Sequence, residues 1–114
     1  MIWKDLLGTP YVEGSDEPGR GLDCRGVCVE LLRRAGRAWS DDPAEWRPVE
    51  RIEDVGPGDV IGSDPEGVGA VTHTAVVVNG RGRTATTVSS GERGGVFSIS
   101  AGRIQHVVGI GRMA

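Results

Sequence analysis

The sequence predicts an α+β domain in which one helix covers one face of an antiparallel sheet of about five strands. An amphipathic helical stretch begins near residue 24, and beyond Gly58 the apolar residues change to the alternation of short strands. Closely spaced turn signals favour an antiparallel sheet, mostly a meander, and a helix followed by a run of strands is typical of the α+β class. With 114 residues, 19 of them glycine, the chain is predicted to form a single domain over residues 1–114.

The helix is predicted to begin at Cys24 and to end before Gly36. Apolar or small residues recur along one face with the spacing of an amphipathic helix, at Cys24, Val27, Cys28, Leu31, Leu32 and Ala35. Asp23 is suited to cap the first turn, and Gly36 is suited to end the last one. Residues 8–23 are dense in glycine, proline and aspartate, so we expect them to form a loop that leads into the helix.

Five short strands are expected after the helix. They cover residues 59–63, 70–79, 83–90, 94–100 and 103–112. The segments SDPEG, NGRG and SGERG between them are turn sequences. Residues 37–57 carry Trp39 and Trp46 and are expected to form a surface excursion that returns to the sheet through a VGPGD turn.

Charge and composition exclude several classes of function. The net charge is −3 and the thirteen Lys and Arg residues are scattered, so we expect no basic stripe that binds nucleic acid. The apolar residues at positions 1–11 are interrupted by Lys4 and Asp5, which predicts neither a signal peptide nor a membrane span. We therefore expect synthesis in the cytoplasm, where both cysteines are reduced thiols.

Cys24 is the candidate nucleophile. A cysteine in the first turn of a helix lies among unpaired backbone N–H groups and at the positive end of the helix dipole, and both stabilise a thiolate. The alternative is that Cys24 is simply the first small apolar residue of a buried helix face, because cysteine is often buried for that reason alone. The helix by itself does not separate these interpretations.

His73 is the candidate base. In AVTHTAVVVN, alternation places His73 on one strand face with Ala75 and Val77. If this face packs against the helix, His73 points toward the layer that carries Cys24, and a cysteine with a distant histidine is the pairing that makes a thiolate nucleophile. The alternative is a histidine that only fills the core.

A zinc site is another use of these residues. Cys24, Cys28, His73 and His106 are conceivable ligands, but three residues between two cysteines on one helix differ from the two-residue spacing of structural zinc sites. We therefore expect neither a metal nor another cofactor. His106 is instead expected to be a solvated or edge residue.

Several motifs, taken in order, resemble those of the NlpC/P60 family of cell-wall cysteine peptidases. They are GTPYVEGSDEPGRGLDCRG, GPGDVIGSD and VTHTAVVVNGRGR, and the closing IQHVVGIGR is similar to the last strand of short phage-tail members. The family pattern is G-x-P-Y, a glycine-rich loop, D-C-S-G at a helix start, P-G-D before a strand, and a strand that bears a histidine. The resemblance extends over nearly the whole chain.

The resemblance implies a papain-like fold in which the helix carries the nucleophile and the sheet carries the base. It makes Cys24 the nucleophile and His73 the general base. It also places Tyr11 at the site, in contact with the substrate or the oxyanion, and it assigns Asp23 to recognition of a free stem-peptide amine. The backbone N–H of Cys24 would contribute to the oxyanion hole.

Two positions depart from the family pattern. Arg25 stands where the family usually has serine, so a substrate-contacting hydroxyl is replaced by a cation at the substrate site. Ala85 stands where the family often has a histidine that orients the base. On the strand face of the base we expect Thr87, opposite Ala75, to be the orienting residue, with Ser89 as the alternative. Both are equally compatible with an ordinary structural role.

These observations predict a cysteine peptidase that hydrolyses amide bonds in peptidoglycan stem peptides. The phage-tail resemblance extends the prediction to a tail-tip cell-wall hydrolase, located on a virion or tail-like particle with tail proteins as partners. The departures at Arg25 and Ala85 leave a second hypothesis open, a weak or inactive structural or wall-binding component of a tail. A third hypothesis is an amidase, deamidase or acyltransferase that uses the same cysteine and histidine.

Overall fold

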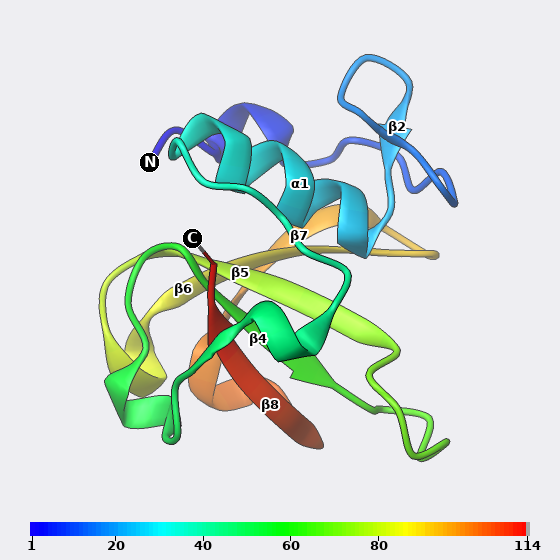
Figure 1. The fold of residues 1–114 in the computed structure, drawn as a ribbon. Helices are drawn as coiled ribbons and strands as arrows, with labels where there is room; N and C mark the ends of the chain where they lie inside the picture. Colours follow the sequence, from blue (N-terminus) through cyan, green and yellow to red (C-terminus); the bar gives the residue numbers. More distant parts are fainter. Residues whose placement is uncertain (114) are drawn as a thin grey trace.

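The computed structural model describes residues 1–113, in which one α-helix packs on a six-stranded antiparallel sheet. Helix α1 (Cys24–Arg34) lies across one face of the sheet, against β5 and β6 (Figure 1). The strands are β3 (Arg47–Pro48), β4 (Asp59–Ser63), β5 (His73–Asn79), β6 (Thr86–Gly91), β7 (Gly95–Ser100) and β8 (Val107–Arg112). The α+β prediction is confirmed, and no helix in the described part is long and apolar enough to cross a membrane.

The sheet differs from the expected meander in two ways. All five expected strands are present, but the strand order is β3-β8-β4-β5-β6-β7, so the last strand lies beside the first long one. A sixth strand, β3, pairs with β8 at the sheet edge, where Arg47 is opposite Arg112 and Pro48 is opposite Gly111. This strand has only two residues, so no alternation in the sequence announces it, and its proline is tolerated because the strand lies at an edge.

The approach to the helix is more ordered than the predicted loop. It contains a small hairpin of β1 (Asp16–Glu17) and β2 (Gly21–Leu22). The hydroxyl of Ser90 in β6 donates to the Leu22 carbonyl at 2.6 Å, which ties the hairpin to the sheet. Five single 3₁₀ turns complete the description: η1 (Lys4–Leu6), η2 (Pro43–Glu45), η3 (Ile52–Asp54), η4 (Gly82–Thr84) and η5 (Ala101–Arg103).

The two faces of the sheet bury separate apolar clusters. Val76 and Val78 of β5 pack with the buried face of α1, whereas Val77 belongs to a smaller cluster on the opposite face. His73 has the parity of Val77, so its strand face does not pack against the helix, and the condition under which His73 would point toward the helix layer is not met. Both faces of β5 are apolar, and alternation alone therefore could not say which one the helix covers.

Candidate active site

Cys24 is the first residue of α1 and is half-buried. Asp23 caps the helix, because its Oδ1 accepts a hydrogen bond from Gly26 N at 2.6 Å. The position of Gly26 must be a glycine, because a Cβ there would collide with the carbonyl of Ser15. The thiol therefore lies at the N-terminal end of the helix, where first-turn N–H groups lack intrahelical acceptors.

His73 begins β5 and reaches Cys24 from the strand end rather than from the face under the helix. Its Nε2 lies 2.8 Å from the hydroxyl oxygen of Ser89. That hydroxyl donates its single hydrogen to the Thr74 carbonyl at 2.7 Å, so it accepts at the ring. Nε2 therefore carries the ring hydrogen, and Nδ1 is left as the nitrogen that can accept a thiol proton.

Ser89, and not Thr87, is the residue that contacts the imidazole. Thr87 is fully buried, lies opposite Val77 rather than Ala75, and donates its hydroxyl to the Ile99 carbonyl at 2.8 Å. The expected register was displaced by two residues because the connection from β5 to β6 contains a 3₁₀ turn and a register shift after Val77. The preference for Thr87 over Ser89 was thus wrong, although both side chains share the predicted strand face.

The environment of Cys24 favours its thiolate. Burial of the side chain raises the pKa, but the neighbouring His73 ring and the Thr74 backbone N–H, which favour the charged thiolate, outweigh that effect. The pKa of Cys24 is therefore lower than that of an ordinary thiol. A low-pKa thiol that is partly accessible is the form of cysteine that acts as a nucleophile.

Tyr11 and Asp23 flank the thiol on the side of the N-terminal loop. Tyr11 is half-buried, and its pKa is raised by burial and then by the negative charges of Glu13, Asp23 and Cys24. Besides capping α1, Asp23 accepts a hydrogen bond from Gly14 N on its Oδ2 at 2.7 Å. Both Asp23 oxygens thus bind backbone groups, and this side chain fixes the loop against the helix start.

Arg25 is exposed and points to the excursion between α1 and β3. Its guanidinium binds Asp41 through two hydrogen bonds, at 2.7 and 3.1 Å. Trp39 Nε1 donates to the same carboxylate at 2.6 Å. These two donors, Arg25 first, lower the pKa of Asp41 to about 2. Arg25 therefore links the helix start to the tryptophan-bearing excursion.

Two hollows lie on either side of the strand that carries the base. One, of about 500 Å³, is mainly apolar, includes Thr74, and is bordered by Trp39 and Trp46. The two indole rings pack edge to face, with 5.7 Å between their ring centroids. The other, of about 400 Å³, is lined in part by His73, Ser89 and the exposed residues Gln105 and His106. Alternation in the last strand could not place Gln105 and His106 beside His73.

Within residues 1–113 no three His, Cys, Asp or Glu side chains are grouped so that they could hold a metal ion. Cys28 lies one turn beyond Cys24, is fully buried, and donates to Thr74 Oγ1 at 3.5 Å. Burial raises its pKa to about 12. The chemistry available at the site is therefore that of a thiol, an imidazole and a serine hydroxyl.

Solved structures with the same fold come from NlpC/P60 proteins. A Staphylococcus aureus subsp. aureus Mu50 protein, described as similar to lipoprotein of the NLP/P60 family, superposes with a TM-score of 0.69 at 23% identity, covering 95% of this chain and 37% of its own. NlpC2 from Trichomonas vaginalis superposes with a TM-score of 0.77 at 24% identity, and the match covers 96% of this chain and 43% of NlpC2. The NlpC/p60 domain of peptidoglycan hydrolase SagA superposes with a TM-score of 0.70 at 21% identity, and the match covers 96% of this chain and 91% of the SagA domain.

No protein-family model matches the chain, and no curated protein matches it. The chain spans less than half the length of the first two structural neighbours but nearly all of the third. The likeness is thus one of three-dimensional structure, and it shows that this chain has the NlpC/P60 fold.

Proposed function

We propose that this chain is a cysteine peptidase that hydrolyses amide bonds in peptidoglycan stem peptides. The observation that carries the proposal is the lowered pKa of the Cys24 thiol beside His73, whose second nitrogen is bound by Ser89. A nucleophile, a base and a group that orients the base are the parts that covalent amide hydrolysis needs. The description of one protein of this fold as a peptidoglycan hydrolase supports the choice of polymer.

In the proposed mechanism His73 Nδ1 takes the proton of Cys24, and the sulfur attacks the carbonyl carbon of the scissile amide. The tetrahedral oxyanion is stabilised by the free N–H at the start of α1 and by the hydroxyl of Tyr11. His73 then gives its proton to the leaving amine, and a thioester to Cys24 remains. His73 deprotonates a water molecule, which attacks the thioester, and the thiol is regenerated with release of the acid.

Two further roles belong to the same proposal. Asp23, which lies beside Tyr11, contributes negative charge at the place where a free stem-peptide amine would bind. Arg25 is directed to Asp41 and so acts on substrate through the tryptophan-bearing excursion rather than as a serine substitute. A location at the tip of a phage or phage-like tail stays a prediction from the sequence resemblance.

The test is digestion of purified peptidoglycan by the wild-type chain, with released peptides identified by mass spectrometry. Cys24→Ala is expected to lose hydrolysis, whereas Cys28→Ala, one turn along the same helix, is expected to retain it. Circular dichroism checks that both variants are folded. Hydrolysis that survives in Cys24→Ala contradicts the proposal.

The same assay separates the other hypotheses from this one. A folded wild-type chain that binds peptidoglycan without releasing peptides indicates a structural or wall-binding component. This outcome is favoured by the fact that a serine hydroxyl, rather than a second histidine, contacts His73. A chain that is inert on peptidoglycan but releases ammonia or transfers acyl groups from glutamine peptides indicates a deamidase or acyltransferase.

A further inference from the structure

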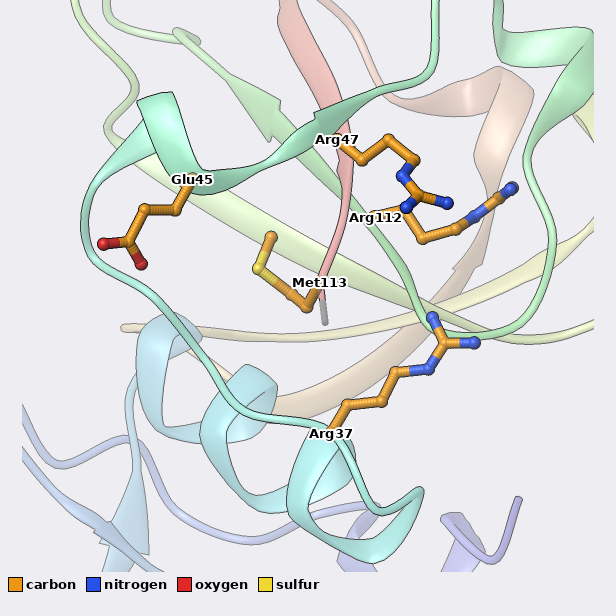
Figure 2. Close-up of a pocket in the computed structure, with 5 residues that line it drawn as sticks. All are labelled: Arg37, Glu45, Arg47, Arg112 and Met113. Carbon is orange, nitrogen blue, oxygen red and sulfur yellow. The ribbon is translucent and has the colours of Figure 1, made fainter.

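We propose that four arginines beyond the C-terminal end of α1 form a binding site for a phosphate-type dianion. The arginine cluster consists of Arg37, Arg47, Arg81 and Arg112, and three of its members are drawn in Figure 2. Cys24 begins α1, and Arg37 follows the other end of that helix, so the cluster and the candidate active site lie at opposite ends of it. No step of amide hydrolysis uses these side chains.

Three strands place charges in a row at one end of the sheet. Arg47 of β3 is the Cα partner of Arg112 in β8, and Arg112 is in turn the partner of Asp59 in β4. Like charges directly opposite each other on paired strands destabilise a sheet. Arg47, Arg112 and Asp59 together carry one excess positive charge. An anion bound between the guanidinium groups of Arg47 and Arg112 would relieve their repulsion.

Arg37 and Arg81 add two more positive charges beside this row. Each guanidinium lies over a glycine of the turn before β4: a Cβ at Gly58 would be 2.8 Å from Arg37 Nη1, and a Cβ at Gly56 would be 2.7 Å from Arg81 Nη1. Arg37 Nη1 is buried and has no hydrogen-bond partner within residues 1–113. A cation desolvated in this way is costly unless a negative charge lies near it.

The nearby carboxylates do not balance the cluster. Asp59 is fully buried and already binds Arg112 through two hydrogen bonds of 2.7 and 2.9 Å, while its Oδ2 also accepts from Gly56 N at 2.9 Å. Glu45 accepts from the Ser40 hydroxyl at 2.7 Å, and its carboxylate points away from the guanidinium groups (Figure 2). Among the residues that the structure describes, Arg37, Arg47 and Arg81 form no ion pair.

Shape and charge together indicate the ligand. Hollows of about 350 and 210 Å³ share Arg37 and Arg112, with Arg47 on the first and Arg81 on the second. Counted over the residues that the structure describes, four guanidinium groups against two carboxylates leave two positive charges, which a dianion neutralises. Guanidinium forks approaching from several directions suit the tetrahedral oxygens of a phosphate better than the single plane of a carboxylate.

The test is titration of inorganic phosphate into the full chain at constant ionic strength, followed by calorimetry and by ³¹P NMR line broadening. Saturable binding at one site is expected, and Arg37→Gln and Arg81→Gln should each weaken it at least tenfold. Arg93→Gln is the matched control, because Arg93 is an exposed arginine in the turn between β6 and β7. It should leave the affinity within twofold of wild type. Arg112 is left intact, because its loss would strand the buried Asp59 charge.

Three results would overturn the proposal: no saturable binding of phosphate to the folded wild-type chain, an equal loss of affinity in Arg93→Gln, or tighter binding of malonate than of phosphate. Titrations with glycerol phosphate and with a phosphodiester oligomer distinguish a monoester from a polymer as the natural source of the group. Because the readout is binding, its result does not depend on whether the chain hydrolyses peptidoglycan.

Discussion

Cys24 and Cys28 lie one turn apart on the same helix, yet their surroundings give the two thiols opposite properties. Cys24 is half-buried beside His73 and has a lowered pKa, whereas Cys28 is fully buried in the helix–sheet core and has a pKa of about 12. Thr74 contacts both: its backbone N–H stabilises the Cys24 thiolate, and its hydroxyl accepts a hydrogen bond from Cys28. One strand residue thus serves a reactive thiol and a structural one.

The difference shows that helix position alone does not make a cysteine reactive. Both thiols belong to the same apolar stripe of α1, but only the first turn meets the end of β5, where His73 projects past the core. One turn further on, the helix faces Val76 and Val78, which offer no charge or donor. The strand end that the helix start meets therefore decides which of the two cysteines can be ionised.

The largest expected effect is on thiol labelling. At pH 7 a thiol with a pKa of about 12 is ionised in roughly one molecule in 10⁵, whereas the lowered pKa of Cys24 leaves a larger fraction of that thiol ionised. We therefore expect iodoacetamide to label Cys24 at least about a hundredfold faster than Cys28 in the folded chain. Peptide mapping of the labelled protein measures the ratio, and equal labelling of Cys24 and Cys28 without unfolding would show that the two thiols do not differ in reactivity.

Removal of His73 should bring the two thiols closer together. The His73 ring lowers the pKa of Cys24, so in His73→Ala the midpoint of Cys24 alkylation against pH should move upward and labelling at pH 7 should slow. His106→Ala is the matched control, because His106 is exposed and enters none of the causes of the Cys24 shift. An unchanged midpoint in His73→Ala would show that the helix start alone sets the pKa of this thiol.

A smaller effect is expected from Ser89→Ala, which leaves His73 in place but removes the contact that fixes its tautomer. One hydrogen bond contributes about 1 kcal/mol, so turnover should fall about fivefold. Thr87→Val is the control, since the Thr87 hydroxyl binds the Ile99 carbonyl instead of the ring. If both variants lose activity equally, the role of Ser89 is only structural.

The preference for Thr87 over Ser89 shows which feature of the strands the sequence does not predict. Alternation placed both on the strand face of His73, and this parity is correct, because parity survives any shift of two residues. The register between β5 and β6 depends instead on the 3₁₀ turn at Gly82–Thr84 and on the irregular pairing after Val77. A glycine-rich turn sequence does not specify either feature. A single serine contact decided by a bulge could not be read from the sequence.

The helix and its cap were predictable for the opposite reason. Asp23, the apolar stripe and Gly36 are local signals, and the structure places the cap, the helix and a left-handed Gly36 at those residues. The arginine cluster was not predictable, because it joins residues from the helix end, β3, the turn after β5 and the last strand. Arg47 and Arg112 come together because β8 returns to lie between β3 and β4.

The smallest expected effect concerns the cap that fixes the helix start on which Cys24 depends. Asp23→Ala removes the acceptors of Gly26 N and Gly14 N, so the free energy of unfolding should fall by about 1–2 kcal/mol, the usual value of an N-cap. Asp23→Asn keeps one side-chain oxygen for the Gly26 bond and should lose less. Urea unfolding measures both. Because the cap holds the turn of Cys24 and not the turn of Cys28, the rate of Cys24 alkylation should change in Asp23→Ala while Cys28 stays unreactive. If Asp23→Ala has the same free energy of unfolding as wild type, the loop contacts alone position the helix start.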